Sequence, residues 1–263
     1  MTKSMKVTRS LKERELDSQI DQFRIRIKDA NDLKVKDDVF DTRTLLNLYT
    51  LAKKGIIDAL GGAISTGKEA NIFYATGKSG MLAIKIYRIT TSNFKAMQDY
   101  LIGDPRFGSI KGTKRAIVSE WTKKEYRNLL RAKESGVRVP SPVAIRENIL
   151  IMEFISVGEV PAPQIRDINL SYDEAKLAFD EITEIVAVLY NKAGLVHGDL
   201  SEFNILYIDH PVLIDMGQSV TLDHPMAETF LSRDINNIAR YFKKKYDIGS
   251  AEAIWERVRQ FEH

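Results

Sequence analysis

Three polar side chains stand among apolar residues toward the end of the chain. Asp199 and Asn204 are five residues apart across a polar loop, and Asp215 directly follows the apolar run 212–214. Carboxylate and amide oxygens are hard ligands of the kind that Mg²⁺ prefers, together with water and phosphate oxygens. In one kind of phosphoryl-transfer site, an Asp accepts the proton of the attacking hydroxyl while an Asn and a second Asp bind the metal. The spacing predicts such a site, with Asp199 as the base and Asn204 and Asp215 as metal ligands.

A lysine interrupts the apolar run 81–87, which the pattern predicts to be a strand. Because side chains alternate along a strand, Lys85 is expected to face away from Ile84 and Ile86. A buried lysine requires an anion, which Glu125 or the phosphates of a nucleotide could supply. An exposed lysine on an edge strand is the alternative if Lys85 is considered alone. The complete set in chain order favours the functional interpretation: Lys85, Glu125, Asp199, Asn204 and Asp215.

The run 148–155 is predicted to be a strand that leads into a connection between two lobes. In the functional interpretation, backbone groups of Glu153 and Ile155 bond the edge of an adenine, and Met152 lines the pocket behind it. The alternative is an ordinary core strand that ends in a charged residue, which explains Met152 well and Glu153 adequately.

A second nucleotide motif competes for the stretch 62–68, which satisfies the pattern G-x-x-x-x-G-K of a P-loop. Glu69 follows this stretch, where a P-loop has the Ser or Thr that binds Mg²⁺. The chain then continues into the strand-like residues 72–74, whereas a P-loop continues into a helix whose N-terminus binds phosphate. We therefore reject the P-loop interpretation.

The elements around these residues predict an α+β fold with two lobes and a cleft between them. Helical spacing runs from 42 to 60, where Gly61 and Gly62 are expected to end it. Five antiparallel strands and one main helix, at 119–135, are expected to form the N-terminal lobe. Further elements are expected as follows: a hairpin turn at 77–80, a short helix within 91–107, a basic loop at 108–115, a linker at 157–163, and helices at 171–193, 226–246 and 251–261.

Composition limits the class of protein. The chain of 263 residues is 44% hydrophobic and 29% charged, an ordinary globular balance, and it has no cysteine, which excludes disulfides and thiolate metal sites. Neither a membrane-spanning run nor a signal peptide is visible, so a cytoplasmic protein without a membrane partner is expected.

The net charge is +3, and basic residues gather in two regions. Solvated helix faces are one interpretation, and contacts with a nucleic acid backbone are the other. The two groups are Lys111, Lys114, Arg115, Lys123, Lys124, Arg127 and Arg131, and Arg240, Lys243, Lys244 and Lys245.

Four motifs together resemble those of the RIO atypical serine/threonine protein kinases, most closely the type-one branch in a compact, archaeal-like form without long basic tails. The motifs are S-T-G-K-E-A at 65–70, W-T-K-K-E-Y-R-N-L at 121–129, H-G-D-L-S-E-F-N at 197–204 and I-D-M-G-Q at 214–218. The resemblance implies a bilobal protein-kinase-like fold with a truncated, mostly helical C-terminal lobe. The implied division is a charged segment 1–40, partly helical or mobile, and a RIO kinase domain 41–263, with added helices at 41–60, an N-lobe at 61–155 and a C-lobe at 156–263.

The resemblance also implies roles for particular residues. Lys85 would bind the α- and β-phosphates while paired with Glu125, and Asp199, Asn204 and Asp215 would act as above. The other nucleotide-binding residues would be Ser65, Thr66, Gly67, Lys68, Glu69, Ala70, Phe73, Met152, Glu153, Ile155, Ser201 and Glu202. Asp234 resembles a buried carboxylate that steadies the catalytic loop, and a charge on a helix surface is its alternative.

Only about a dozen residues separate Asp215 from the next predicted helix, and they contain no Ala-Pro-Glu. An activation loop and a peptide-docking platform would not fit. In the family, the absence of these parts accompanies autophosphorylation on serine and ATPase activity. The resemblance also implies that phosphate can pass through the aspartate at position 215, and that the protein acts in maturation of the small ribosomal subunit. ATP, Mg²⁺ (or Mn²⁺ in its place), the chain itself as substrate, and the pre-ribosomal small subunit or its rRNA are the implied partners.

Two other functions remain open at this point. The first is a nucleotide-gated factor that binds rRNA or the pre-ribosome, in which hydrolysis only times release. The second is a small-molecule phosphotransferase, which shares the H-x-D-x-x-x-x-N pattern but is disfavoured by the loop 65–70.

Overall fold

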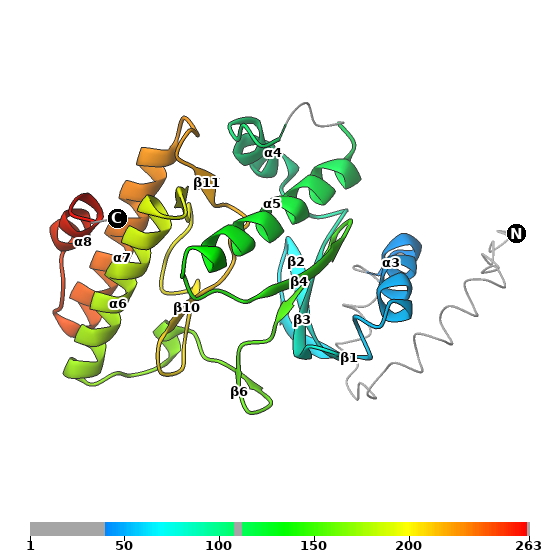
Figure 1. Ribbon diagram of the computed structural model, residues 1–263, viewed down its shortest axis with the longest axis horizontal. Helices are drawn as coiled ribbons and strands as arrows, with labels where there is room; N and C mark the ends of the chain where they lie inside the picture. Colours follow the sequence, from blue (N-terminus) through cyan, green and yellow to red (C-terminus); the bar gives the residue numbers. More distant parts are fainter. Residues whose placement is uncertain (1–39, 108–111, 262–263) are drawn as a thin grey trace, which may run out of the picture.

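The computed structural model describes residues 40–107 and 112–261, and the charged segment expected at 1–40 lies almost wholly outside these ranges (Figure 1). Five antiparallel strands form one sheet in the order β1-β2-β3-β5-β4. The α+β fold with a five-stranded antiparallel sheet is therefore confirmed. Its strands are β1 (Ala59–Thr66), β2 (Ala70–Gly77), β3 (Gly80–Tyr87), β4 (Pro142–Arg146) and β5 (Ile149–Glu153).

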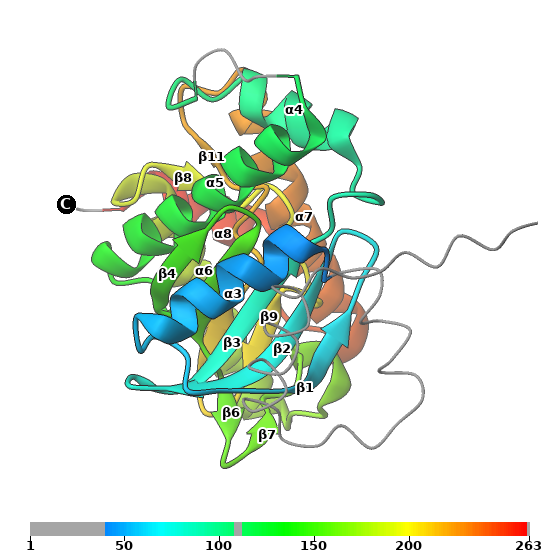
Figure 2. The ribbon, with the colours of Figure 1, turned by 90° about the vertical axis from the view of Figure 1, so that its right-hand side faces the viewer.

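A helix packs on each face of the sheet. Helix α3 (Thr42–Lys53) lies across one face, as Figure 2 shows, and contributes Leu48 and Leu51 to an apolar cluster with the β3 residues Ile84 and Ile86. Helix α5 (Lys114–Glu134) packs on the other side. Because side chains alternate along β3, Lys85 points away from the α3 cluster.

The helical region expected at 41–60 is wrong in its second half, and Gly61 and Gly62 do not end a helix. Helix α3 ends at Lys53, just before Gly55, whose φ of 66° is easy for glycine, and β1 begins at Ala59. Gly61 lies within β1, where a Cβ would come 2.8 Å from the Tyr74 ring. This glycine thus allows close packing of the strand on Tyr74.

The main helix begins earlier than the expected 119–135. Helix α5 starts at Lys114, and the Thr113 side chain caps it by accepting the Ala116 N–H. Lys114 and Arg115 are therefore helical, whereas residues 108–111 of the expected basic loop lie outside the described ranges. The short helix expected within 91–107 is α4 (Phe94–Ile102), which packs beside α5.

The C-terminal lobe is mostly helical, as expected, and follows a small hairpin at the linker. Ser171 caps α6 in a capping box with Glu174. None of the helices in the described residues is long and apolar enough to cross a membrane. The elements are β6 (Ser156–Val157), β7 (Val160–Pro161), η1 (Ile165–Asp167), α6 (Tyr172–Asn191), β8 (Leu195–Val196), β9 (Ile205–Tyr207), β10 (Pro211–Leu213), β11 (Val220–Thr221), α7 (Ala227–Tyr246) and α8 (Ala251–Arg259).

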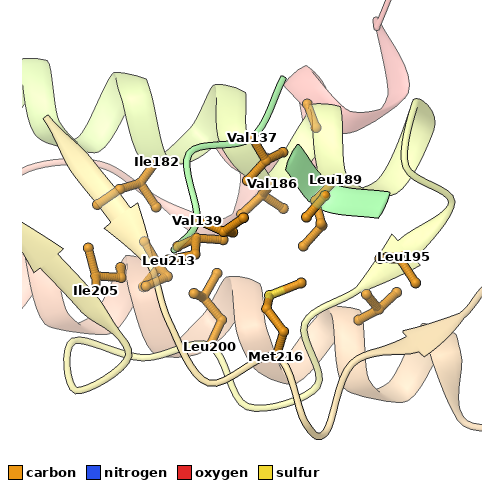
Figure 3. Close-up of a cluster of buried hydrophobic side chains, with 14 of the residues drawn as sticks. Val137, Val139, Ile182, Val186, Leu189, Leu195, Leu200, Ile205, Leu213 and Met216 are labelled. Carbon is orange, nitrogen blue, oxygen red and sulfur yellow. The ribbon is translucent and has the colours of Figure 1, made fainter. Parts of the chain in front are cut away.

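The loops that carry the acidic residues are anchored in the core of this lobe. Leu200 and Met216 point into the same buried cluster as Ile182 of α6 and Leu213 of β10 (Figure 3). Leu200 and Met216 are each no more than 1% exposed. Because these neighbours are packed in the core, the positions of Asp199 and Asp215 follow from apolar packing.

Candidate active site

A cavity of about 470 Å³ lies between the sheet and the C-terminal lobe. Its walls come from strands β1, β2, β3 and β5, from Trp121 of α5, from the segment at 161–164, and from residues 203–206 and 214–218. Of the residues expected from the sequence, the following line it: Ser65, Gly67, Lys68, Glu69, Ala70, Lys85, Met152, Glu153, Ile155, Asn204 and Asp215.

Lys85 lies at the wall of this cavity between two carboxylates. Its Nζ is 2.8 Å from Glu125 Oε1 and 2.9 Å from Asp215 Oδ1, and its side chain is 8% exposed. The Tyr87 hydroxyl donates to the other Glu125 oxygen. Burial lowers the pKa of Lys85, but Asp215 and Glu125 outweigh this effect and hold it well above its ordinary value. Lys85 is therefore an ammonium ion, and both its position on β3 and its Glu125 partner on α5 aim it at the cavity.

Asp215 has an unusual backbone. Its φ is +62°, in the left-handed region that residues other than glycine seldom adopt. Half of its side-chain surface faces the open cavity. The Lys85 ammonium lowers the pKa of Asp215, so this carboxyl is ionised and ready to bind a cation.

The loop before Asn204 is held by two buried side chains. Asp234 of α7 is 1% exposed and accepts the Gly198 N–H at 2.8 Å and the Leu200 N–H at 2.9 Å. It therefore steadies the loop, and the alternative of a surface charge is wrong. His197 Nδ1 accepts the Asp199 N–H at 3.3 Å, so its Nε2–H donates to the Ile214 carbonyl at 3.1 Å. Burial lowers the pKa of His197 to about 4, which keeps the ring neutral.

Asp199 and Asn204 are joined by this loop. Asn204 Nδ2 donates to the Asp199 carbonyl at 2.7 Å, which leaves Oδ1 of the amide as its acceptor atom. Gln218 Nε2 donates to Asp199 Oδ2 at 3.2 Å. Burial, together with the nearby charge of Asp215, raises the pKa of Asp199, which makes it a better proton acceptor than a solvated Asp.

At the other end of the cavity, the predicted adenine contacts are backbone groups. The Glu153 carboxylate is occupied, because it accepts from Arg138 Nη1 at 2.8 Å and from the Ser141 N–H at 3.0 Å. Among the described residues, the Ile155 N–H has no hydrogen-bond partner, whereas its carbonyl accepts from Ala162. A free donor beside an apolar wall suits the edge of a purine base.

Several expected contacts are not made. Phe73 is only 4% exposed and packs on Phe40 at a ring distance of 5.1 Å, on the α3 side of the sheet. Strand alternation is the reason, because its neighbour Ile72 lines the cavity in its place. Thr66, at the end of β1, Asp199 and Ser201 are not among the lining residues, and Glu202 lines a separate cavity on α7. Glu125 lies behind Lys85 and acts on the cavity through it.

The structure adds residues that sequence reasoning missed. Asn71 Oδ1 accepts the Gly67 N–H at 3.2 Å and so shapes the turn at 67–70. Tyr87 and Gln218 contact Glu125 and Asp199, as described above. Tyr87 could have been found, because it is two residues after Lys85 and shares its face of β3. Gln218 stands in the motif at 214–218, but nothing in the sequence indicates its contact with Asp199.

Two members of the basic group between Lys111 and Arg131 do not belong to a basic surface. Lys124 is 0% exposed, so it does not belong to a solvated helix face or a nucleic acid contact. Arg115 forms ion pairs with Asp41 and with Glu147. Neither cation is free to form part of a basic surface.

Comparison with known proteins defines the class. The RIO domain model matches residues 71–253. The RIO-type serine/threonine-protein kinase Rio1 of Haloferax volcanii is 44% identical over 93% of this chain and 84% of its own, and that of Methanocaldococcus jannaschii is 41% identical over 83% and 74%. The chain belongs to the RIO family of serine/threonine-protein kinases, as the sequence motifs predicted, and it is a protein kinase.

Two further relatives bear on size and fold. Human serine/threonine-protein kinase RIO1 is 38% identical over 91% of this chain, which spans only 42% of that protein. The crystal structure of the Rio2 kinase-ADP/Mg²⁺-phosphoaspartate complex from Chaetomium thermophilum matches with a TM-score of 0.62 and 25% identity, over 82% of this chain and 66% of its own.

Proposed function

We propose that this protein is an Mg-ATP-dependent serine/threonine kinase that phosphorylates itself and hydrolyses ATP, and that it acts in the cytoplasm in maturation of the small ribosomal subunit. The observation that carries the catalytic part is the position of Lys85 Nζ, 2.8 Å from Glu125 and 2.9 Å from Asp215 at the cavity wall. The ribosomal part is supported by the motifs shared with the type-one branch.

The residues present fit a metal-bound nucleotide. Among the described residues, no group of three or more His, Asp or Glu side chains could hold a metal ion by itself. Asn204 Oδ1 and the Asp215 carboxylate would supply two hard oxygen ligands, which leaves further positions for phosphate oxygens and water. A bound Mg²⁺, or Mn²⁺ in its place, would neutralise charge on the phosphates. Lys85 would orient the α- and β-phosphates, and residues 65–70 would cover them.

Asp199 would accept the proton of the attacking hydroxyl. The segment 216–226, between Asp215 and α7, is short, and its strand β11 is tied to β8. It leaves no length for a peptide-docking platform. The hydroxyl would thus come from the chain itself or from a large assembly that aligns with the protein.

Asp215 would also serve as a phosphate acceptor. One of its carboxylate oxygens would attack the γ-phosphorus as the bond to the ADP oxygen breaks, and water would then cleave the acyl phosphate to inorganic phosphate and the free carboxylate. The name of the Chaetomium Rio2 complex includes a phosphoaspartate, which supports this route for the present chain.

Labelling with [γ-³²P]ATP tests the proposal. Because an acyl phosphate is cleaved by hydroxylamine and a phosphoserine is not, we expect hydroxylamine to release the label of briefly incubated protein and to spare the label that accumulates on serine. Mass spectrometry of the stable fraction locates the serine. Protein that takes up no label of either kind, although it binds ATP, would contradict the kinase assignment.

A second candidate function is a factor that binds rRNA and uses hydrolysis to time its release. A cavity of about 470 Å³ lined by Arg240, Lys244 and Lys245 of α7 favours it, because it adjoins Glu202 of the catalytic loop. Lys245 donates to the carbonyls of Arg166 and Ile168, whereas Lys244 has no partner among the described residues. Exposed cations of this kind suit a phosphodiester backbone.

The double substitution Arg240→Glu and Lys244→Glu is expected to weaken binding of a single-stranded rRNA fragment and to reduce its salt dependence. Removing one cation that neutralises a phosphate should make the slope of log K against log salt less negative by about 0.7. Binding is measured by fluorescence anisotropy at several salt concentrations. Lys133→Glu with Lys176→Glu carries the same charge change on other exposed helix positions. Equal weakening in the two variants would show that only net charge matters.

A further inference from the structure

Helix α5 buries a second lysine next to Glu125. Lys124 is 0% exposed, and in the described residues no carboxylate lies within ion-pair distance of its Nζ. The Nζ donates instead to the carbonyls of Gly217, at 2.9 Å, and Ser219. Removing a lysine amine from water is costly unless its hydrogen bonds are made, so these two bonds, together with the Trp121 ring 5.3 Å from Nζ, favour its burial.

The same turn is bonded by a second residue of α5. Asn128 Nδ2 donates to the Met216 carbonyl at 2.8 Å and to the Ser219 carbonyl at 2.9 Å. Gly217 packs against Trp121, since a Cβ there would lie 3.0 Å from the indole Nε1. Residues spaced three, four and seven apart share one helix face, so one face of α5 holds the whole turn 216–219.

One active-site group directly precedes this turn, and another lies within it. Asp215 precedes it with a φ of +62°, a conformation that must be maintained by its surroundings. Gln218, within the turn, donates to Asp199 Oδ2. The helix that supplies Glu125 to Lys85 therefore also holds the segment that orients both catalytic carboxylates.

We propose that Lys124 and Asn128 are positioning residues, which fix the turn 216–219 and thereby hold Asp215 in its metal-binding conformation. The proposal rests on the proposed function, because it takes Asp215 as a metal ligand. Removing a residue that orients a metal ligand typically lowers the affinity for the metal by about 10–100-fold.

The bonds of Lys124 do not depend on its charge. Burial lowers the pKa of Lys124 to about 7, although Asp104 opposes this. A neutral amine still has two N–H donors, which is the number that the two carbonyls require. The positioning role is thus the same on both sides of this pKa.

Lys124→Met tests the proposal, with Lys123→Met as the matched control, because Lys123 is the partly exposed neighbour that pairs with Glu120. The Kd of ADP is measured by isothermal titration calorimetry, first in EDTA and then over a range of Mg²⁺ concentrations. For Lys124→Met we expect metal-free ADP binding within about twofold of wild type and a Mg²⁺ requirement raised at least about tenfold. Lys123→Met should match wild type in both.

Asn128→Ala provides a second variant if Lys124→Met does not fold, and it should raise the Mg²⁺ requirement in the same way. Equal losses of metal-free and metal-dependent binding, in step with a lower Tm, would show a structural role only and overturn the proposal. An unchanged Mg²⁺ requirement would also overturn it. If wild-type protein binds ADP equally with and without Mg²⁺, the metal assignment of Asp215 fails, and the positioning role fails with it.

Discussion

Asp215→Ala is expected to reduce Mg-dependent phosphoryl transfer from ATP by at least about a thousandfold, because it removes the proposed metal ligand and phosphate acceptor together. Wild-type Asp215 contacts Lys85 at 2.9 Å, so the variant also leaves that ammonium with Glu125 alone. Alanine at a φ of +62° adds strain of about 1 kcal/mol. Asp215→Asn avoids this strain, because Asn tolerates left-handed backbone, and it should be as inactive.

The measurement is release of inorganic phosphate and incorporation of label, at saturating Mg²⁺ and ATP. Asp223→Ala is the matched control, because Asp223 is an exposed carboxylate in the same segment before α7. It should retain wild-type activity. Substantial turnover by Asp215→Asn would exclude Asp215 from both roles.

Lys85→Met is expected to destabilise the fold as well as abolish activity. Removing one partner of a buried ion pair costs about 3–5 kcal/mol, because the remaining charge is left without compensation. The remaining group is Glu125, which is 1% exposed and keeps only the Tyr87 hydroxyl. The double variant Lys85→Met/Glu125→Gln should recover most of this stability, since the buried charge is gone, and should recover no activity.

The loss of stability in Lys85→Met should also depend on pH. Burial already raises the pKa of Glu125 above its ordinary value although Lys85 opposes this, and loss of the ammonium raises that pKa further. The folded state then binds a proton that the unfolded state releases, so stability is greatest at low pH and falls as pH rises through the folded pKa. Urea unfolding at about pH 5 and about pH 8 measures this difference. Lys78→Met, in the exposed hairpin turn, is the control, and a double variant that is less stable than Lys85→Met would contradict the argument.

The fold class and eleven of the residues that line the cavity could be predicted from sequence, because their signals are local. Lys85 interrupts an apolar strand, and alternation alone placed it opposite Ile84 and Ile86. Asp234 could have been assigned in the same way, since it shares a helical face with Leu231 and Ile238, which are buried. Its role in the loop, by contrast, depends on bonds to Gly198 and Leu200 that no spacing indicates.

The predictions that were wrong concern the direction or burial of side chains that only tertiary packing determines. Ile72 and Phe73 are both apolar, so strand alternation shows that they face opposite ways but not which of them faces the cavity. Lys124 stands in a run of basic residues that is typical of a solvated face, yet the carbonyls of Gly217 and Ser219 provide the buried acceptors that make its burial tolerable. Those acceptors are more than ninety residues away in sequence.

Helix α5 is bonded on one side to the strand that bears Lys85 and on the other to the turn after Asp215. A swing of this helix would break four buried hydrogen bonds to the turn along with the ion pair. Displacing α5 into an inactive arrangement would therefore cost more free energy here than it would for a loosely held helix. The enzymatic centre is assembled as soon as the chain folds, and control over when it reacts falls to whatever governs the arrival and departure of its reactants.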